Sequence, residues 1–76
     1  MEDKVEALEF QVKDTLQKTG IPLQDLKIRN GVLLACISRQ GKIILPRGGD
    51  VMKSGDAVLV VTTILGMKDI NDIFEE

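Results

Sequence analysis

The sequence predicts an α+β fold, a small and mostly antiparallel β-sheet with short helices, and two observations carry this prediction. Residues 32–39, 42–45 and 57–63 are apolar runs that turn-forming residues separate from one another. Runs of this length with such boundaries are typical of strands in an antiparallel sheet. Residues 66–76 change period, and their apolar side chains recur at every third or fourth position, as on one face of an amphipathic helix.

Length and composition bound the architecture. The 76 residues are enough for one small domain, which buries only about 60% of the surface that its unfolded chain exposes. Domains of this size usually need disulfides, a metal or a second subunit for stability. Cys36 is the only cysteine and there is no histidine, so we expect neither an internal disulfide nor a metal site. We therefore expect the chain to pack as a homodimer.

The composition also excludes several partners. A net charge of −2 without Trp or Tyr argues against a nucleic-acid polymer, which needs a basic surface and stacking side chains. No apolar run approaches the roughly 20 residues of a membrane span, so direct membrane insertion is not expected. The charged start, MEDKVEALEF, does not resemble a secretory signal. We expect a cytoplasmic domain.

The first segment, residues 5–13, fits two periods. Val5, Leu8, Val12 and Leu16 form a helical stripe, whereas Leu8, Phe10 and Val12 alternate with polar residues as in a half-exposed strand. The pattern alone leaves helix and strand open. Further on, residues 21–26 predict one or two helical turns, because proline is tolerated at the start of a helix and Leu23 and Leu26 lie three apart.

The central strands are apolar on both faces. A strand over 32–39 places alternate residues on opposite sides. One face would hold Val32, Leu34, Cys36 and Ser38, and the other Leu33, Ala35, Ile37 and Arg39. The run at 57–63 is equally apolar, so we expect both strands to be covered on both sides. Asn30-Gly31 predicts a turn before the first run, and Gln40-Gly41 predicts a hairpin into 42–45.

The segment LPRGGDVMKSGD, residues 45–56, permits a phosphate loop or a pair of tight turns. A phosphate loop is expected to open a helix whose amides complete the anion site, but a strand follows here. We therefore expect structural turns, with Asp50 and Asp56 capping the turn backbone. In the final helix, we expect the apolar side chains to pack on the sheet of the same chain. They are Met67, Ile70, Ile73 and Phe74.

Nothing in the sequence indicates catalysis. A nucleophile needs an adjacent base, and Cys36 is expected to be an inert thiol in a buried strand. The cations of the middle segment are expected on a solvated surface. They are Lys27, Arg29, Arg39, Lys42 and Arg47. We predict that the chain is not an enzyme.

In their order, EALEFQV, IPLQDL, GVLLACISR, SGDAVLVV and MKDINDIFE resemble the TrkA C-terminal domain, also called the C-terminal lobe of the RCK family. This module ends cytosolic subunits of bacterial Trk-type potassium uptake systems. The resemblance covers nearly the whole chain and implies a single regulatory domain over residues 1–76, the C-terminal end of a longer subunit, in which EALEFQV is a strand. The chain has no G-x-G-x-x-G after a strand, so NAD is expected only in the upstream domain and no cofactor here.

The resemblance further implies a homodimer that regulates a potassium transporter at the inner face of the membrane. In some relatives, the cleft between paired lobes binds cyclic di-AMP. Carried over to this sequence, Arg29 would pair with a phosphate, Asn30 would read an adenine edge, and Ile28 and Pro46 would flank a base. Two alternatives stay open, namely a plain turn at Asn30 and a pure dimerisation module without a ligand of its own.

Overall fold

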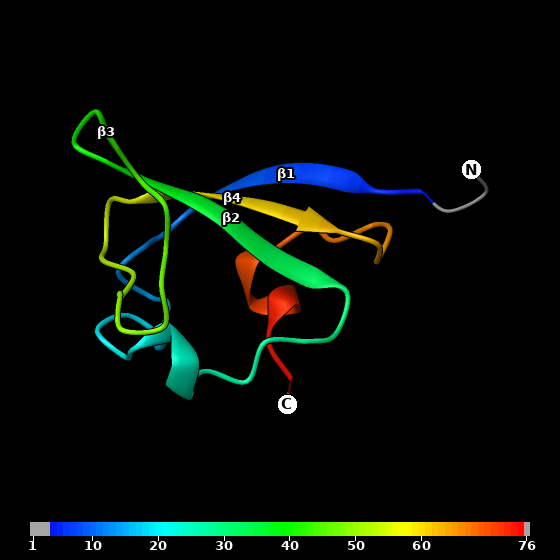
Figure 1. The fold of residues 1–76 in the computed structure, drawn as a ribbon, viewed down its shortest axis with the longest axis horizontal. Helices are drawn as coiled ribbons and strands as arrows, with labels where there is room; N and C mark the ends of the chain where they lie inside the picture. Colours follow the sequence, from blue (N-terminus) through cyan, green and yellow to red (C-terminus); the bar gives the residue numbers. More distant parts are fainter. Residues whose placement is uncertain (1–3, 76) are drawn as a thin grey trace.

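The computed structural model describes residues 4–75, which form one antiparallel sheet with its connections gathered on one side (Figure 1). The strands are β1 (Glu6–Gln11), β2 (Val32–Arg39), β3 (Lys42–Ile44) and β4 (Ala57–Thr62), in the order β1-β4-β2-β3. Two short 3₁₀ helices, η1 (Leu23–Asp25) and η2 (Ile70–Ile73), complete the fold. Every strand pair is antiparallel, as the hairpin signals predict. Within this range no helix has the length and apolarity to cross a membrane.

The first segment is a strand. In β1, the register places Leu8 opposite Val60 and Phe10 opposite Val58, whereas Glu9 is exposed. The alternation of the strand therefore prevails over the helical stripe, because pairing with the apolar β4 buries every second residue. The strand implied by the family resemblance is confirmed.

β2 contains an irregularity that the alternating pattern does not predict. Leu34 pairs with Val60 and Cys36 with the next residue, Leu59, so Ala35 is an extra residue in a β-bulge. A bulge shifts the alternation by one position. Beyond it, Ile37 joins Leu34 on the core side, and Cys36 joins the opposite side. The predicted division of this strand into two faces is therefore wrong after residue 34.

The hairpin between β2 and β3 follows the prediction. Gln40 and Gly41 have φ values of 51° and 78°, the positive values that a type I′ turn requires at both central positions. The register pairs Arg39 with Lys42 and Ile37 with Ile44. The predicted turn is confirmed, and β3 ends at Ile44 rather than at residue 45.

The core lies against one face of the sheet, which we call the inner face. Figure 1 shows both 3₁₀ helices and the long connections below the sheet, on this side. The buried apolar side chains are Val12, Leu16, Leu34, Ile37, Met52, Val58, Val60, Met67, Ile70, Ile73 and Phe74. No part of residues 4–75 covers the other face, where Leu33 is 62% exposed and Ile43 65%. The prediction that β2 and β4 are covered on both sides is therefore not met within a single chain.

The C-terminal segment buries the predicted apolar side chains but forms only one helical turn. Asp69 begins η2 with a capping box, and Phe74 already has extended backbone angles. The helix stops there because the chain pairs with residues 27–29. The Arg29 amide donates to the Ile73 carbonyl at 2.9 Å, and the Glu75 amide donates to the Lys27 carbonyl at 2.7 Å.

Candidate functional site

A surface groove of about 460 Å³ brings together all four residues that the sequence singles out for ligand binding. They are Ile28, Arg29, Asn30 and Pro46. The groove is also lined by Leu23, Gln24, Gly31, Val32, Leu33, Leu34, Arg47 and Gly48. It therefore lies between the turn that leads into β2, the turn η1 and the start of the loop that follows β3.

Backbone hydrogen bonds fix the loop side of the groove to η1. The Leu23 amide donates to the Asp50 carbonyl at 2.9 Å, and the Gln24 amide donates to the Gly48 carbonyl at 3.0 Å. The two segments approach so closely that a Cβ on Gly48 would lie 2.8 Å from Gln24 Oε1. These contacts hold Pro46 beside the rest of the lining, although the two segments are distant in sequence.

The opposite rim is the predicted turn. Gly31 has a φ of 86°, and the Val32 amide donates to the Arg29 carbonyl at 3.2 Å, which closes the turn. The Thr63 amide donates to the Gly31 carbonyl at 2.9 Å and ties the turn to the end of β4. Asn30 is exposed at the tip. The turn prediction is confirmed, and the same residues line the groove.

Arg29 lies at the border between the groove and the C-terminal segment. Its Nη1 donates to the Asp72 carbonyl at 2.9 Å, and it also lines a second hollow, of about 430 Å³, beside Phe74 and Glu75. The amides of Lys68 and Asp69 hold the pKa of the Asp72 carboxyl below its usual value, and the charge of Arg29 adds to the effect. The C-terminal segment thus orients the Arg29 guanidinium.

The charge of the groove favours an anionic ligand. Arg29 and Arg47 contribute two guanidinium groups, and its lining within the described chain includes no carboxylate. Guanidinium groups match the geometry of phosphate oxygens. Sequence reasoning assigned Arg47 to a solvated surface. Arg47 is exposed but lines the groove. Its position directly after Pro46, a predicted site residue, was the sequence signal that could have identified it.

The loop after β3 consists of structural turns, as predicted. Asp50 Oδ2 accepts from the Arg47 amide at 2.7 Å, and Asp56 Oδ2 accepts from the Lys53 amide at 2.8 Å. In each turn the Asp amide donates back to the carbonyl of the same partner residue, at 2.9 and 3.0 Å. Both carboxylates therefore cap turns, as the sequence predicts.

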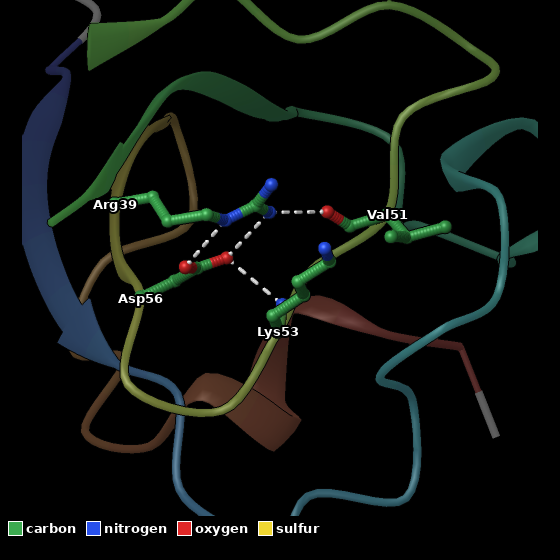
Figure 2. A network of polar contacts seen from close by, with 4 residues as sticks. All are labelled: Arg39, Val51, Lys53 and Asp56. Atoms are coloured by element: carbon green, nitrogen blue, oxygen red, sulfur yellow. Dashed lines mark hydrogen bonds and ion pairs between the residues drawn. The ribbon is translucent and has the colours of Figure 1, made fainter. Parts of the chain in front are cut away.

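Asp56 also holds Arg39 in a network that Figure 2 shows from close by. Arg39 Nε and Nη2 donate to the two carboxylate oxygens of Asp56, each at 2.9 Å, and Nη2 also donates to the Val51 carbonyl at 2.9 Å. The guanidinium of Arg39 lowers the pKa of Asp56, and the pairing raises the pKa of Arg39. The prediction of a solvated Arg39 is wrong, because the bulge turns this residue toward Asp56, which is 1% exposed.

Cys36 differs from its predicted environment. It is half-buried and pairs with Leu59 on the uncovered face of the sheet, outside the core cluster. Among residues 4–75, no cluster of three or more His, Cys, Asp or Glu side chains is placed to hold a metal ion.

Comparisons with known proteins give a consistent result. The family model of the TrkA-C domain matches residues 9–75. A Trk system potassium uptake protein trkA homolog 1 of Methanosarcina mazei is 32% identical over 96% of this chain, and a Trk system potassium uptake protein TrkA homolog of Archaeoglobus fulgidus is 35% identical over 93%. The chain covers 18% and 16% of their lengths. Both organisms are archaea, so these relatives do not support the bacterial origin that the resemblance implied.

A solved structure described as "Structure of RCK domain with cda" has a similar fold. Its TM-score is 0.63 with 22% sequence identity, and the match covers 71% of this chain and 76% of that one. The likeness supports the small antiparallel sheet with few short helices as an RCK-type arrangement.

Proposed function

This chain belongs to the TrkA-C domain family, and on that premise we propose that it is a non-catalytic regulatory domain of a Trk-type potassium uptake system. It pairs as a homodimer in the cytoplasm and binds an anionic effector, for which cyclic di-AMP is the leading candidate. The effector state is passed through the attached domain to a potassium transporter. The observation that carries this proposal is the groove that gathers Ile28, Arg29, Asn30 and Pro46.

The lining of the groove suits the parts of a cyclic dinucleotide. Arg29 and Arg47 supply cations for phosphate oxygens, and Ile28 and Pro46 supply apolar contacts for a base. A side-chain amide can form two hydrogen bonds with the edge of adenine, and Asn30 is exposed at the rim. The likeness to an RCK domain solved with cda is a further support.

Regulation requires that the effector distinguish two arrangements of the paired domains. A ligand with equal affinity for both arrangements would shift nothing. A cyclic dinucleotide has twofold symmetry, so a ligand held between two grooves would contact both chains equally. The cleft would then favour the arrangement in which the grooves face each other.

The test is a calorimetric titration of cyclic di-AMP into the chain and two variants. Arg29→Gln removes one of the two groove cations, and Lys27→Gln removes the same charge two residues away, from an exposed side chain outside the groove. We expect saturation near one ligand per two chains. Hydrogen bonds to charged groups contribute about 1.5–3 kcal/mol, so Arg29→Gln should weaken binding at least tenfold and Lys27→Gln only slightly.

Two results would contradict the effector assignment. Absence of heat at high micromolar ligand would leave a module that dimerises and transmits without a ligand of its own. Equal losses in both variants would show that binding depends on net charge and not on the groove.

A further inference from the structure

We propose that residues 72–75 position Arg29 for an anionic ligand, so that occupation of the groove and attachment of these residues strengthen each other. We call residues 72–75 the C-terminal strap. This inference rests on the proposed function and deepens it, because it names the element that regulates the affinity of the same groove.

The C-terminal strap forms a two-stranded ribbon with the segment that leads into the groove. The Arg29 amide donates to the Ile73 carbonyl at 2.9 Å, and the Glu75 amide donates to the Lys27 carbonyl at 2.7 Å. Residues 27–29 lie outside the four strands of the sheet. The ribbon therefore gives this part of the connection the fixed course that the sheet does not provide.

Arg29 is held at three points, two of them on the C-terminal strap. Its amide is bonded to the Ile73 carbonyl, and its Nη1 donates to the Asp72 carbonyl at 2.9 Å. Its own carbonyl accepts from the Val32 amide at 3.2 Å in the turn. A long side chain loses rotamer freedom when it is fixed, and a group that is already held in one orientation loses less on binding. The strap therefore pre-organises the guanidinium for a ligand.

The contact with the strap leaves the charge of Arg29 available. A guanidinium has five N–H groups, and the strap engages Nη1 through a backbone carbonyl. The Asp72 carboxylate is used in the cap of η2, where it accepts from the Asp69 amide at 3.2 Å. Arg39 is a contrast, because both carboxylate oxygens of Asp56 pair with it. An anion can therefore bind Arg29 without displacing the strap, so the two attachments should cooperate rather than compete.

The strap also positions Ile28, the apolar neighbour of Arg29 in the groove. Ile28 and Phe74 stand opposite each other in an antiparallel bridge, between the two hydrogen bonds of the ribbon. Phe74 is 6% exposed, and Ile28 packs against the same core. The strap thus places one cation and one apolar side chain of the groove lining.

Coupling of this kind acts in both directions. If attachment of the strap raises the affinity of the groove by some factor, an occupied groove strengthens the attachment by the same factor. Glu75 is exposed, so a contact that drew the strap away would lower the affinity for the ligand without touching the groove.

The first test compares Glu75→Pro with Glu75→Ala by calorimetric titration of cyclic di-AMP. Proline has no amide hydrogen and deletes the bond to the Lys27 carbonyl, whereas alanine keeps this bond and is the matched control. Phe74 has a φ of −100° and a ψ of 147°, which suit the residue before a proline. We expect Glu75→Pro to weaken binding about threefold and Glu75→Ala to leave it unchanged, with circular dichroism as the check on folding.

A double-mutant cycle shows whether the effect passes through Arg29. In the Arg29→Gln chain, titrated at higher ligand concentrations, Glu75→Pro should cause no further loss of affinity. A loss of the same size in that chain would show that the proline weakens the groove by a general loosening of the fold, and would overturn the positioning role of the strap.

Hydrogen exchange tests the reverse direction in the unchanged chain, so this measurement does not depend on the folding of a variant. We expect saturating cyclic di-AMP to slow the exchange of the Arg29 and Glu75 amides about threefold. The Gly20 amide is the control, because it donates to the Met52 carbonyl outside the groove. Its exchange, which reports local opening elsewhere, should stay the same.

The outcomes separate this inference from the proposed function. Equal affinity of the two Glu75 variants, or unchanged exchange at Arg29 and Glu75, would overturn the coupling and leave the effector groove intact. Tighter binding by Glu75→Pro would also overturn it, since the strap would then compete with the ligand. If the unchanged chain binds no cyclic di-AMP, the effector assignment and the coupling are both overturned.

Discussion

Arg39 and Asp56 form a bidentate ion pair that joins the end of β2 to the residue preceding β4. Two parallel hydrogen bonds of 2.9 Å link Arg39 to the two carboxylate oxygens of Asp56. The carboxylate also accepts the Lys53 amide, and the guanidinium also donates to the Val51 carbonyl. One ion pair thus fixes the strand and the loop relative to each other (Figure 2).

Replacing Asp56 should destabilise the fold through this network. Asp56→Asn leaves Arg39 without its carboxylate in a site where Asp56 is 1% exposed, and we expect a loss of roughly 1–3 kcal/mol in the free energy of unfolding. Asp50→Asn is the matched control, because the Asp50 carboxylate closes the same kind of turn through the backbone amide of Arg47 and is not paired with a guanidinium, and should cost about 0.5 kcal/mol or less. Urea unfolding measures the stability of both variants. Equal losses would show that the Asp56 carboxylate stabilises the fold only by capping its turn and not by pairing with Arg39.

The same ion pair predicts acid sensitivity. The Arg39 guanidinium lowers the pKa of Asp56 in the folded state. The stability that the ion pair contributes is therefore fully present above the usual carboxyl pKa of about 3.9. It is lost as the pH falls through the lower pKa of the folded state. We expect urea midpoints that stay level from neutral pH to about 5 and then fall. Asp56→Asn should show a shallower fall, and an unchanged slope would contradict this account.

Phe74 is predicted to be a core residue despite its position near the end of the chain. It is 6% exposed, belongs to the main cluster and has Lys18 Nζ at 5.4 Å from the centre of its ring. Phe74→Ala should therefore cost about 3–5 kcal/mol, a large part of the 5–15 kcal/mol typical of a domain. Thermal unfolding measures the loss. Leu65→Ala, at an exposed position, should change the midpoint of thermal unfolding little. If Phe74→Ala lowered the midpoint no more than Leu65→Ala, the core assignment of Phe74 would be contradicted.

Gly31 is predicted to be restricted by a contact as well as by its backbone angle. Gly31 and Gly41 both have positive φ, so alanine at either position is strained by about 1–2 kcal/mol. Only at Gly31 would the new Cβ meet another group, at 2.6 Å from Thr63 Oγ1. Gly31→Ala should therefore cost more than Gly41→Ala in urea unfolding.

Thr63→Ala in the same chain should remove that excess, since it deletes the obstructing hydroxyl. A Gly31→Ala variant that Thr63→Ala does not rescue would show that the backbone angle alone sets the cost.

The strands and turns were predictable because each depends on residues close together in sequence. Gln40 and Gly41 set the hairpin by their own backbone preferences. The helical spacing of apolar residues at the C-terminal end correctly predicted that Ile70 and Ile73 are buried. It did not predict that η2 ends at Ile73. That end depends on hydrogen bonds to residues 27–29, far away along the chain.

The features that sequence reasoning missed depend on an inserted residue or on distant partners. Ala35 forms a bulge inside a run that is apolar on both faces, so the alternation gave no sign of it. The Arg39 pairing with Asp56 follows from that bulge and joins residues 17 positions apart. In the groove, the family resemblance supplied Arg29 and Asn30, whereas Arg47 was missed although it directly follows Pro46.

The bulge at Ala35 determines which side of the sheet each residue in the second half of β2 faces. Leu33 and Arg39 are an even number of positions apart, so a regular strand would place them on the same side. Because of the extra residue, Leu33 lies on the uncovered face of the sheet, whereas Arg39 lies on the inner face and pairs with Asp56. Deleting Ala35 would leave Leu33 and Arg39 an odd number of positions apart, and a regular strand would then still place them on opposite sides. Among homologous chains, a one-residue gap at this point of an alignment would therefore mark a domain whose second strand lacks the bulge but keeps the same residues on each side of the sheet.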